Sequence, residues 1–289
     1  MWGIKKILVA GWGPAVLAAF CASAFLPCAA HPGIDEQILR LDEQIAAAPD
    51  DAALFLRRGE LHRIHREWAK AAADYRTALR LDPELRIAEF CLGRLEVESG
   101  SPAQARAILD RYLSARPDDP LALAYRGRAL VALGEPLLGA EDFSRAIRHS
   151  DPPRPEDYLE RARALASAGP EHVGRAIEGL DEGLRVLGEP VTLQDYAIEL
   201  ELGRRSFDAA LRRLDRIASQ SVRQEPWLVR KAAILEAAGR VEEARAAYRQ
   251  TLASIETLPA ERRGNKAVER LEREAQQGLE RLGRGPTAP

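Results

Sequence analysis

The chain has 289 residues, of which 46% are apolar and 30% charged, which is enough to build a substantial core. Its formal net charge is −2, so it lacks the strong positive field that favours nucleic acid or an anionic membrane surface. We therefore expect no nucleic-acid partner. The abundance of Ala, Leu, Arg and Glu indicates an all-α protein.

Residues 1–30 have the pattern of an export signal, with Lys5 and Lys6 followed by a long apolar run and small residues at the end. Cleavage is expected after Ala30, with a site after Ala24 as the alternative. Residues 7–27 are also long enough to span a bilayer, so an uncleaved inner-membrane anchor stays open. Both alternatives place the rest of the chain in the periplasm or cell envelope, and membrane contact is expected only through an uncleaved leader.

Residues 33–47 carry apolar side chains at helical spacing, with Ile34, Ile38, Leu41 and Ile45 on one face. The segment precedes the first of several repeated units. We expect residues 31–50 to form an N-terminal capping helix.

Residues 52–83 are organised as two amphipathic helices of about 14 residues joined by a short turn at Arg66-Glu67. The pattern recurs with a period of 34 residues, seen in Gly59, Gly93 and Gly127. Six units follow from this period, and the fourth carries an insertion of about two residues near Gly169-Pro170. The predicted units are 52–85, 86–119, 120–153, 155–190, 191–224 and 225–258.

In a 34-residue frame the first unit has Gly59 in slot 8, Ala71 in slot 20, Tyr75 in slot 24, Ala78 in slot 27 and Pro83 in slot 32. This set resembles the tetratricopeptide repeat, a helix–turn–helix of that period. The resemblance implies an all-α, right-handed α-solenoid of about six helix-turn-helix repeats with N- and C-terminal capping helices. It also implies a non-enzymatic protein that binds a protein or peptide partner over residues 51–258.

Residues 259–282 are predicted to form one charged C-terminal helix that solvates the end of the solenoid. Its narrow apolar stripe consists of Val268, Leu271, Ala275, Leu279 and Leu282. Residues 283–289 are expected to be a disordered tail.

The histidines offer little support for a metal site. His62 and His65 stand three residues apart in the first repeat, whereas a structural or catalytic zinc needs three or four ligands. His62 falls in slot 11, an inward position, so we interpret it as a core residue. A metal-dependent enzyme or copper-binding protein that uses His31, His62 and His65 is the least favoured alternative, and no cofactor is expected.

The remaining polar and thiol groups have structural interpretations. The acidic pairs Asp50-Asp51 and Asp118-Asp119 lie in turns between units, where they are expected to cap the following helices. Cys91, the one cysteine outside the leader, is expected to be a small buried residue.

The resemblance implies that slots 2, 5, 9 and 12 of the first helices line a concave groove. Arginines 34 and 35 residues apart occupy slot 9 of three successive units. The predicted partner-binding residues are Leu56, Arg63, Phe90, Arg94, Tyr125, Arg128 and Arg163. An extended partner segment with acidic side chains would suit such arginines, because a guanidinium binds carboxylates bidentately.

Two alternatives stay open for this surface. The arginines could instead pair with Glu60, Glu98 or Glu160 on neighbouring helices. The protein could also be a scaffold subunit of a cell-envelope complex, in which the repeats mainly hold the geometry of the assembly.

Overall fold

The computed structural model describes residues 33–283, which form fifteen α-helices and one short 3-10 helix without any strand. Among these residues no helix is both long and apolar enough to cross a membrane. The predicted export signal 1–30, His31 and the tail after Gly283 lie outside the described residues.

The helices follow the predicted repeats closely. Their bounds are α1 (Ile34–Ala47), α2 (Ala52–Ile64), α3 (Trp68–Leu81), α4 (Arg86–Glu98), α5 (Pro102–Ala115), α6 (Pro120–Ala132), α7 (Pro136–His149), α8 (Pro155–Ala168), η1 (Pro170–His172), α9 (Val173–Leu187), α10 (Val191–Gly203), α11 (Phe207–Gln220), α12 (Glu225–Ala237), α13 (Val241–Glu256), α14 (Ala260–Arg263) and α15 (Lys266–Gly283). The six predicted helix pairs are α2–α3, α4–α5, α6–α7, α8–α9, α10–α11 and α12–α13, and all six are present.

The chain divides into two units at Cys91–Leu92, and each is described by itself. In the first unit, α1 packs against α2 and α2 packs against α3. The predicted N-terminal helix therefore has an apolar residue in the core, Leu41, which is 4% exposed. Asp51 caps α2 by accepting a hydrogen bond from the Ala53 N–H at 2.9 Å, as the sequence predicts.

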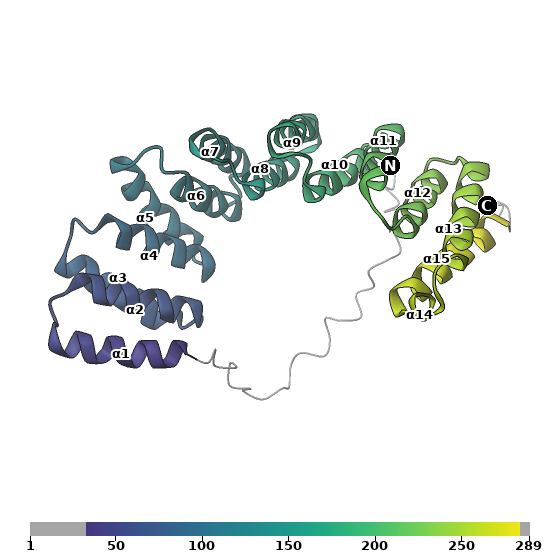
Figure 1. Cartoon of the computed structure of the whole chain (residues 1–289). Coiled ribbons are helices and arrows are strands. Elements are labelled where there is room, and N and C mark those ends of the chain that lie inside the picture. Colours follow the sequence, from purple (N-terminus) through teal and green to yellow (C-terminus); the bar gives the residue numbers. More distant parts are fainter. Residues whose placement is uncertain (1–32, 284–289) are drawn as a thin grey trace, which may run out of the picture. The chain divides into compact units, whose positions relative to one another are not determined.

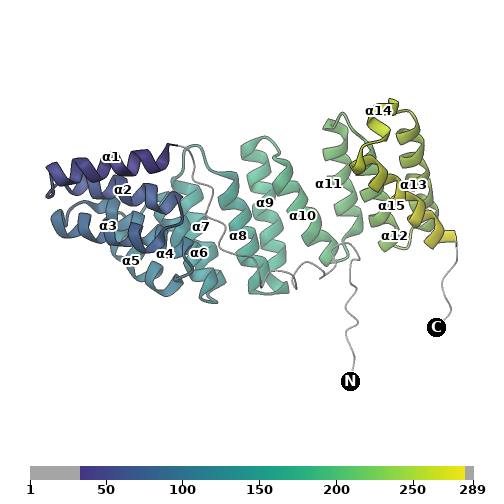
Figure 2. The same cartoon turned by 90° about the horizontal axis from the view of Figure 1, so that it is seen from below.

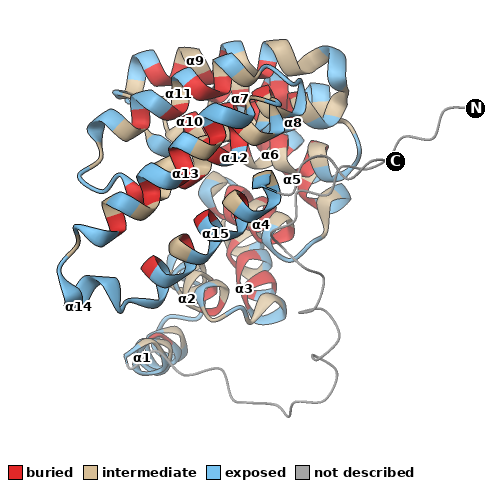
Figure 3. Cartoon of the chain, turned by 90° about the vertical axis from the view of Figure 1, so that its right-hand side faces the viewer, coloured by how far each residue is buried: buried red, intermediate tan, exposed pale blue. Residues whose placement is uncertain are grey.

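In the second unit, each first helix packs against the second helix of its own repeat and of the preceding one, as α6 does with α7 and α5. Figure 1 shows the first helices α6, α8 and α10 on one side of the row and the second helices α7, α9 and α11 on the other. Figure 2 shows the same helices following one another along the row. The buried residues lie where neighbouring helices face each other (Figure 3).

Glycine in slot 8 lets the two helices of a repeat approach closely, as the sequence predicts. A Cβ added at Gly59 would lie 2.7 Å from Tyr75 Cε1, and one at Gly93 would lie 2.7 Å from Leu109 Cγ. Both distances are too short for real side chains, so these positions exclude any larger residue without a shift of the helices.

The turn inside five of the six repeats contains one residue with a left-handed backbone. This position is taken by glycine in three repeats, at Gly100, Gly134 and Gly239, and by Arg66 and Arg205 in two others, both with φ of 59°. In the fourth repeat the predicted insertion forms η1, and Gly169 precedes it with φ of 147°. The helix–turn–helix period thus survives even where the turn residue is not glycine.

The C-terminal region differs from the prediction of one continuous helix over residues 259–282. It forms a short α14 and then α15, separated at Gly264 and Asn265. The predicted stripe is otherwise confirmed, since Val268, Leu271 and Ala275 are buried. Leu279 and Leu282 are partly buried against the same core.

α15 is held on α12 and α13 by polar contacts as well as by this stripe. The Arg281 guanidinium donates to both carboxylate oxygens of Glu236 at 3.1 Å. Arg245 donates to the Leu282 carbonyl at 2.5 Å. The helix therefore closes the apolar end of the last repeat, as a capping helix does.

Candidate functional site

The predicted binding residues all lie on first helices, namely α2, α4, α6 and α8. In the second unit we call the surface at slots 5, 6 and 9 of α6, α8, α10 and α12 the first-helix face. It contains three of the predicted residues, Tyr125, Arg128 and Arg163. Leu56, Arg63 and Phe90 belong to the first unit, and Arg94 lies half-buried in α4.

Arg128 and Tyr125 form a stacked pair on α6. The Arg128 guanidinium carbon lies 4.9 Å from the centroid of the Tyr125 ring. Its Nε is also 3.8 Å from a carboxylate oxygen of Glu160 on α8, and both side chains are about a third exposed. A guanidinium stacked on a ring keeps its in-plane N–H donors available for a ligand, so the pair remains able to bind one.

A second stacked pair joins two repeats. Arg163 on α8 lies 5.7 Å from the centroid of the Tyr196 ring on α10. Burial raises the pKa of the Tyr196 hydroxyl, while Arg163 opposes that shift, so the ring carries a neutral phenol at physiological pH. Arg163 itself is exposed.

Tyr196, Asp195 and Arg230 also belong to the first-helix face, although they were not among the residues predicted from the sequence. Arg230 on α12 donates to Asp195 on α10 at 2.6 Å, which continues the row of polar contacts. Tyr125, Tyr196 and Arg230 all occupy slot 6 of their repeats. Weighing slot 6 equally with slot 5 would have found them.

Phe90 corrects one prediction. It is 5% exposed, so it belongs to the interior and cannot supply the exposed apolar contact expected of it. Arg63 is only 19% exposed, and its Nε lies 3.3 Å from Glu60. The alternative pairing with acids is thus found for Arg63, and in a looser form for Arg128.

His62 and Asp119 have the structural roles that the sequence predicts, a core residue and a helix cap. His62 is buried, with Nδ1 2.5 Å from Glu67 and Nε2 3.9 Å from Asp74, as a core residue would be. Asp119 caps α6 by accepting from the Ala122 N–H at 2.9 Å. Within residues 33–283 no three His, Cys, Asp or Glu side chains come together as a metal site would require.

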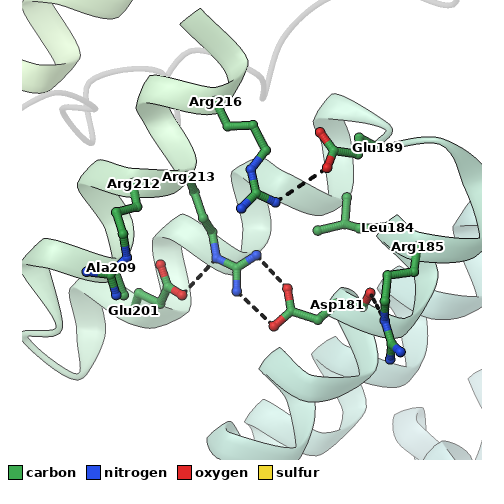
Figure 4. Close-up of a pocket in the computed structure, with 9 residues that line it drawn as sticks. All are labelled: Asp181, Leu184, Arg185, Glu189, Glu201, Ala209, Arg212, Arg213 and Arg216. Carbon is green, nitrogen blue, oxygen red and sulfur yellow. Dashed lines mark hydrogen bonds and ion pairs between the residues drawn. The ribbon is translucent and has the colours of Figure 1, made fainter. Parts of the chain in front are cut away.

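A cavity of about 360 Å³ lies between α9, α10 and α11, among the second helices (Figure 4). At its centre Arg213 donates to Asp181 at 2.6 and 3.0 Å and to Glu201 at 2.7 Å. Burial lowers the pKa of Arg213, but the hydrogen bonds to these two carboxylates more than offset it and raise the pKa overall. Arg213 is therefore a fixed cation that joins three helices.

The structure so far defines an α-solenoid of helix–turn–helix repeats, and comparison with known proteins agrees. Residues 92–155 and 197–259 match the tetratricopeptide repeat family. These two regions therefore consist of tetratricopeptide repeats, which are protein–protein interaction modules. A comparison with curated proteins found no significant match.

Solved structures share the fold at low sequence identity. A tetratricopeptide repeat protein from Parabacteroides merdae ATCC 43184 aligns with a TM-score of 0.54 and 15% identity, over 84% of this chain and 92% of that one. MamA from Desulfovibrio magneticus RS-1 aligns with a TM-score of 0.50 and 17% identity, over 54% and 86%. The APC/C hetero-tetramer Cut9-Hcn1 aligns with a TM-score of 0.51 and 14% identity, over 84% of this chain and 46% of that one.

Proposed function

We propose that this protein is a non-enzymatic adaptor outside the cytoplasm that binds an extended, acidic segment of a partner protein along the first-helix face. The observation that carries the proposal is the pair of arginine–tyrosine stacks on consecutive repeats, Arg128 with Tyr125 and Arg163 with Tyr196. Each stack offers a cation for a carboxylate and an aromatic ring for an apolar side chain.

The spacing of the stacks suits an extended chain. Packed helix axes lie about 8–10 Å apart. An extended peptide advances about 3.3 Å per residue. Successive stacks therefore correspond to about three residues of partner, so acidic side chains roughly three positions apart could reach Arg128 and Arg163 together.

The face is not uniformly basic, because Glu160 and Glu199 lie among the arginines. A face with both acidic and basic side chains favours one register of a partner segment over others, since a shifted segment would place like charges opposite one another. The partner is thus expected to be selected by charge pattern rather than by total charge.

The proposed location rests on residues 1–30, whose basic head and apolar run are typical of an export signal. An intact mass of the protein purified from the cell envelope should lack residues 1–30. Recovery of the full-length chain would support the alternative of an uncleaved anchor, and recovery from the cytoplasm would overturn the location.

The binding face is tested by site-specific photocrosslinking in cells. A photoreactive phenylalanine analogue at Tyr196 should crosslink the partner, while the same analogue at Val186, which is 56% exposed on the second helix α9, should not. Crosslinks from Val186 but not from Tyr196 would overturn the proposed face and favour the scaffold alternative.

The role of the arginines is tested with the triple variant Arg94→Gln, Arg128→Gln and Arg163→Gln. It should fold normally and capture less partner, and the remaining binding should lose most of its dependence on salt. Unchanged capture together with a loss of stability would show that these arginines are structural.

A further inference from the structure

Two cavities occupy the same place in the repeat array, 71 residues apart. One, of about 260 Å³, lies among α5, α6 and α7, and the other, of about 360 Å³, lies among α9, α10 and α11. Both are on the second-helix side, away from the first-helix face. The first therefore serves as an internal comparison for the second.

Each cavity is built around one arginine held by two acids. In the first, Arg126 on α6 donates to Asp110 at 2.9 Å and to Asp142 at 2.7 Å. In the second cavity the position equivalent to Asp142 is Arg213 on α11, and the position equivalent to Asp110 is Asp181 on α9. Arg213 donates a hydrogen bond to Asp181. We call one arginine held by two acids an ionic clamp. Both cavities contain one, but its arginine lies on a first helix in the first cavity and on a second helix in the second.

The cavities differ in net charge. The first is lined by three arginines and three acids, and so is formally neutral; these are Arg106, Arg126, Arg145, Asp110, Glu141 and Asp142. The second is lined by four arginines and three acids, which leaves one positive charge. Two of these arginines have no counterpart in the first cavity, since Arg212 stands where that cavity has Glu141, and the position equivalent to Arg185 is Ser114, which does not line it.

These two arginines have no carboxylate partner in the described part of the chain. Arg185 reaches only the backbone carbonyl of Asp181, at 3.3 Å, and Arg212 makes no ion pair. The acids of the cavity are already engaged, because Asp181 and Glu201 hold Arg213 and Glu189 lies 3.4 Å from Arg216. The cavity therefore holds two guanidinium groups without a carboxylate contact and one net positive charge.

We propose that the cavity between α9 and α11 binds a small ligand that carries two anionic groups, such as a diphosphate or a dicarboxylate. Figure 4 shows Arg212 and Arg185 on opposite sides of the Arg213–Asp181 pair, and the proposed ligand has one anionic group for each of them. Guanidinium forks match phosphate and carboxylate oxygens equally well. The cavity volume falls at the lower end of the range for small-molecule sites.

The test is calorimetric titration of the purified protein with pyrophosphate, succinate and orthophosphate, at constant ionic strength set by sodium chloride. We expect pyrophosphate or succinate to bind at one site, and whichever binds more tightly identifies the class of ligand. Failure of both to bind, or orthophosphate binding as tightly as pyrophosphate, would overturn the proposal.

The double variant R185S/R212E places at these two positions the residues found 71 positions earlier, Ser114 and Glu141. Both side chains are exposed, so the fold should persist, and affinity for the anion should fall at least tenfold. Arg212→Gln alone keeps the test informative if the double variant does not fold. Arg106→Gln in the neutral cavity should leave binding unchanged, and undiminished binding by R185S/R212E would overturn the proposal.

Discussion

Gly93→Leu tests the close contact on which the repeat packing depends. Gly93 lies in α4, and a Cβ at this position would be 2.7 Å from Leu109 Cγ and 2.8 Å from Leu109 Cδ2 on α5. Leu109 is fully buried. It cannot swing into solvent, so the two helices must separate or Leu109 must leave its rotamer.

The expected change in the free energy of unfolding combines two opposing effects. Replacing glycine inside a helix by a better helix former stabilises by about 1 kcal/mol. Extra carbons forced into a filled core cost about 1–3 kcal/mol, and a leucine places more atoms in the contact than a single methyl group. We expect Gly93→Ala to lower the free energy of unfolding by about 1 kcal/mol and Gly93→Leu to lower it by about 3 kcal/mol or more.

Urea unfolding monitored by circular dichroism gives the size of the effect, and hydrogen exchange gives its location. Because repeats contact mainly their neighbours, faster exchange should centre on α2 to α7 and leave α12 and α13 unchanged. The control is Gly174→Ala, where the nearest atom to an added Cβ is 3.7 Å away, and it should be neutral or stabilising. Unchanged unfolding of Gly93→Leu would refute the assigned repeat frame.

Three further substitutions test the turns, the C-terminal cap and the ionic clamps. Gly239→Ala should destabilise by about 1 kcal/mol in urea unfolding although no atom lies within 4 Å of the added Cβ, because φ there is +76°. The hydrogen bond from Arg281 lowers the pKa of Glu236 in the folded protein. The stabilisation that this pair gives the folded state is therefore present above the unfolded pKa of about 4.3 and is lost as the pH falls through the folded pKa. Arg281→Gln should remove that part of the acid dependence of thermal unfolding. Arg126→Gln should destabilise by about 3 kcal/mol or more in the same urea assay, because it leaves Asp142, whose side chain is 5% exposed, buried without its cation.

The helix pairs could be predicted from the sequence because their determinants are local and periodic. Gly59 and Gly93 mark the close contacts, and the spacing of apolar residues marks the buried face of each helix. Even the fifth repeat, whose first helix has weak repeat marks, forms α10 with Leu193, Ala197 and Ile198 fully buried. Tertiary packing between neighbours supplies what the local signal lacks.

The binding surface could be predicted only in part, because side-chain partners depend on neighbouring repeats. Slot 9 correctly placed Arg128 and Arg163 on first helices, but the ring under Arg163 comes from the next repeat, at Tyr196. Phe90 was expected on the surface because its slot shows which face of the helix it lies on, but not how deeply neighbouring residues bury that face. The break at Gly264 was missed because the predicted stripe begins only at Val268 and so carries no information on the residues before it.

The ionic clamps show why residue positions within the 34-residue repeat predict the fold better than they predict a binding site. Arg58 in the first unit bridges Asp42 and Asp74, which lie 16 residues before and after it, and Arg126 bridges Asp110 and Asp142 at the same spacing. The arginine of such a clamp can come from either helix of a repeat, provided that it reaches its acids with good hydrogen-bond geometry, as Arg126 and Arg213 both do.

Arg213 illustrates the consequence, since it reverses the arrangement and holds Asp181 and Glu201 from the opposite side of the junction. The two junctions thus share their helix packing but differ in charge at neighbouring positions, where Ser114 and Glu141 of the first correspond to Arg185 and Arg212 of the second. Residues that differ between equivalent junctions, and not those that recur, are accordingly where a ligand-binding property of this chain should be sought.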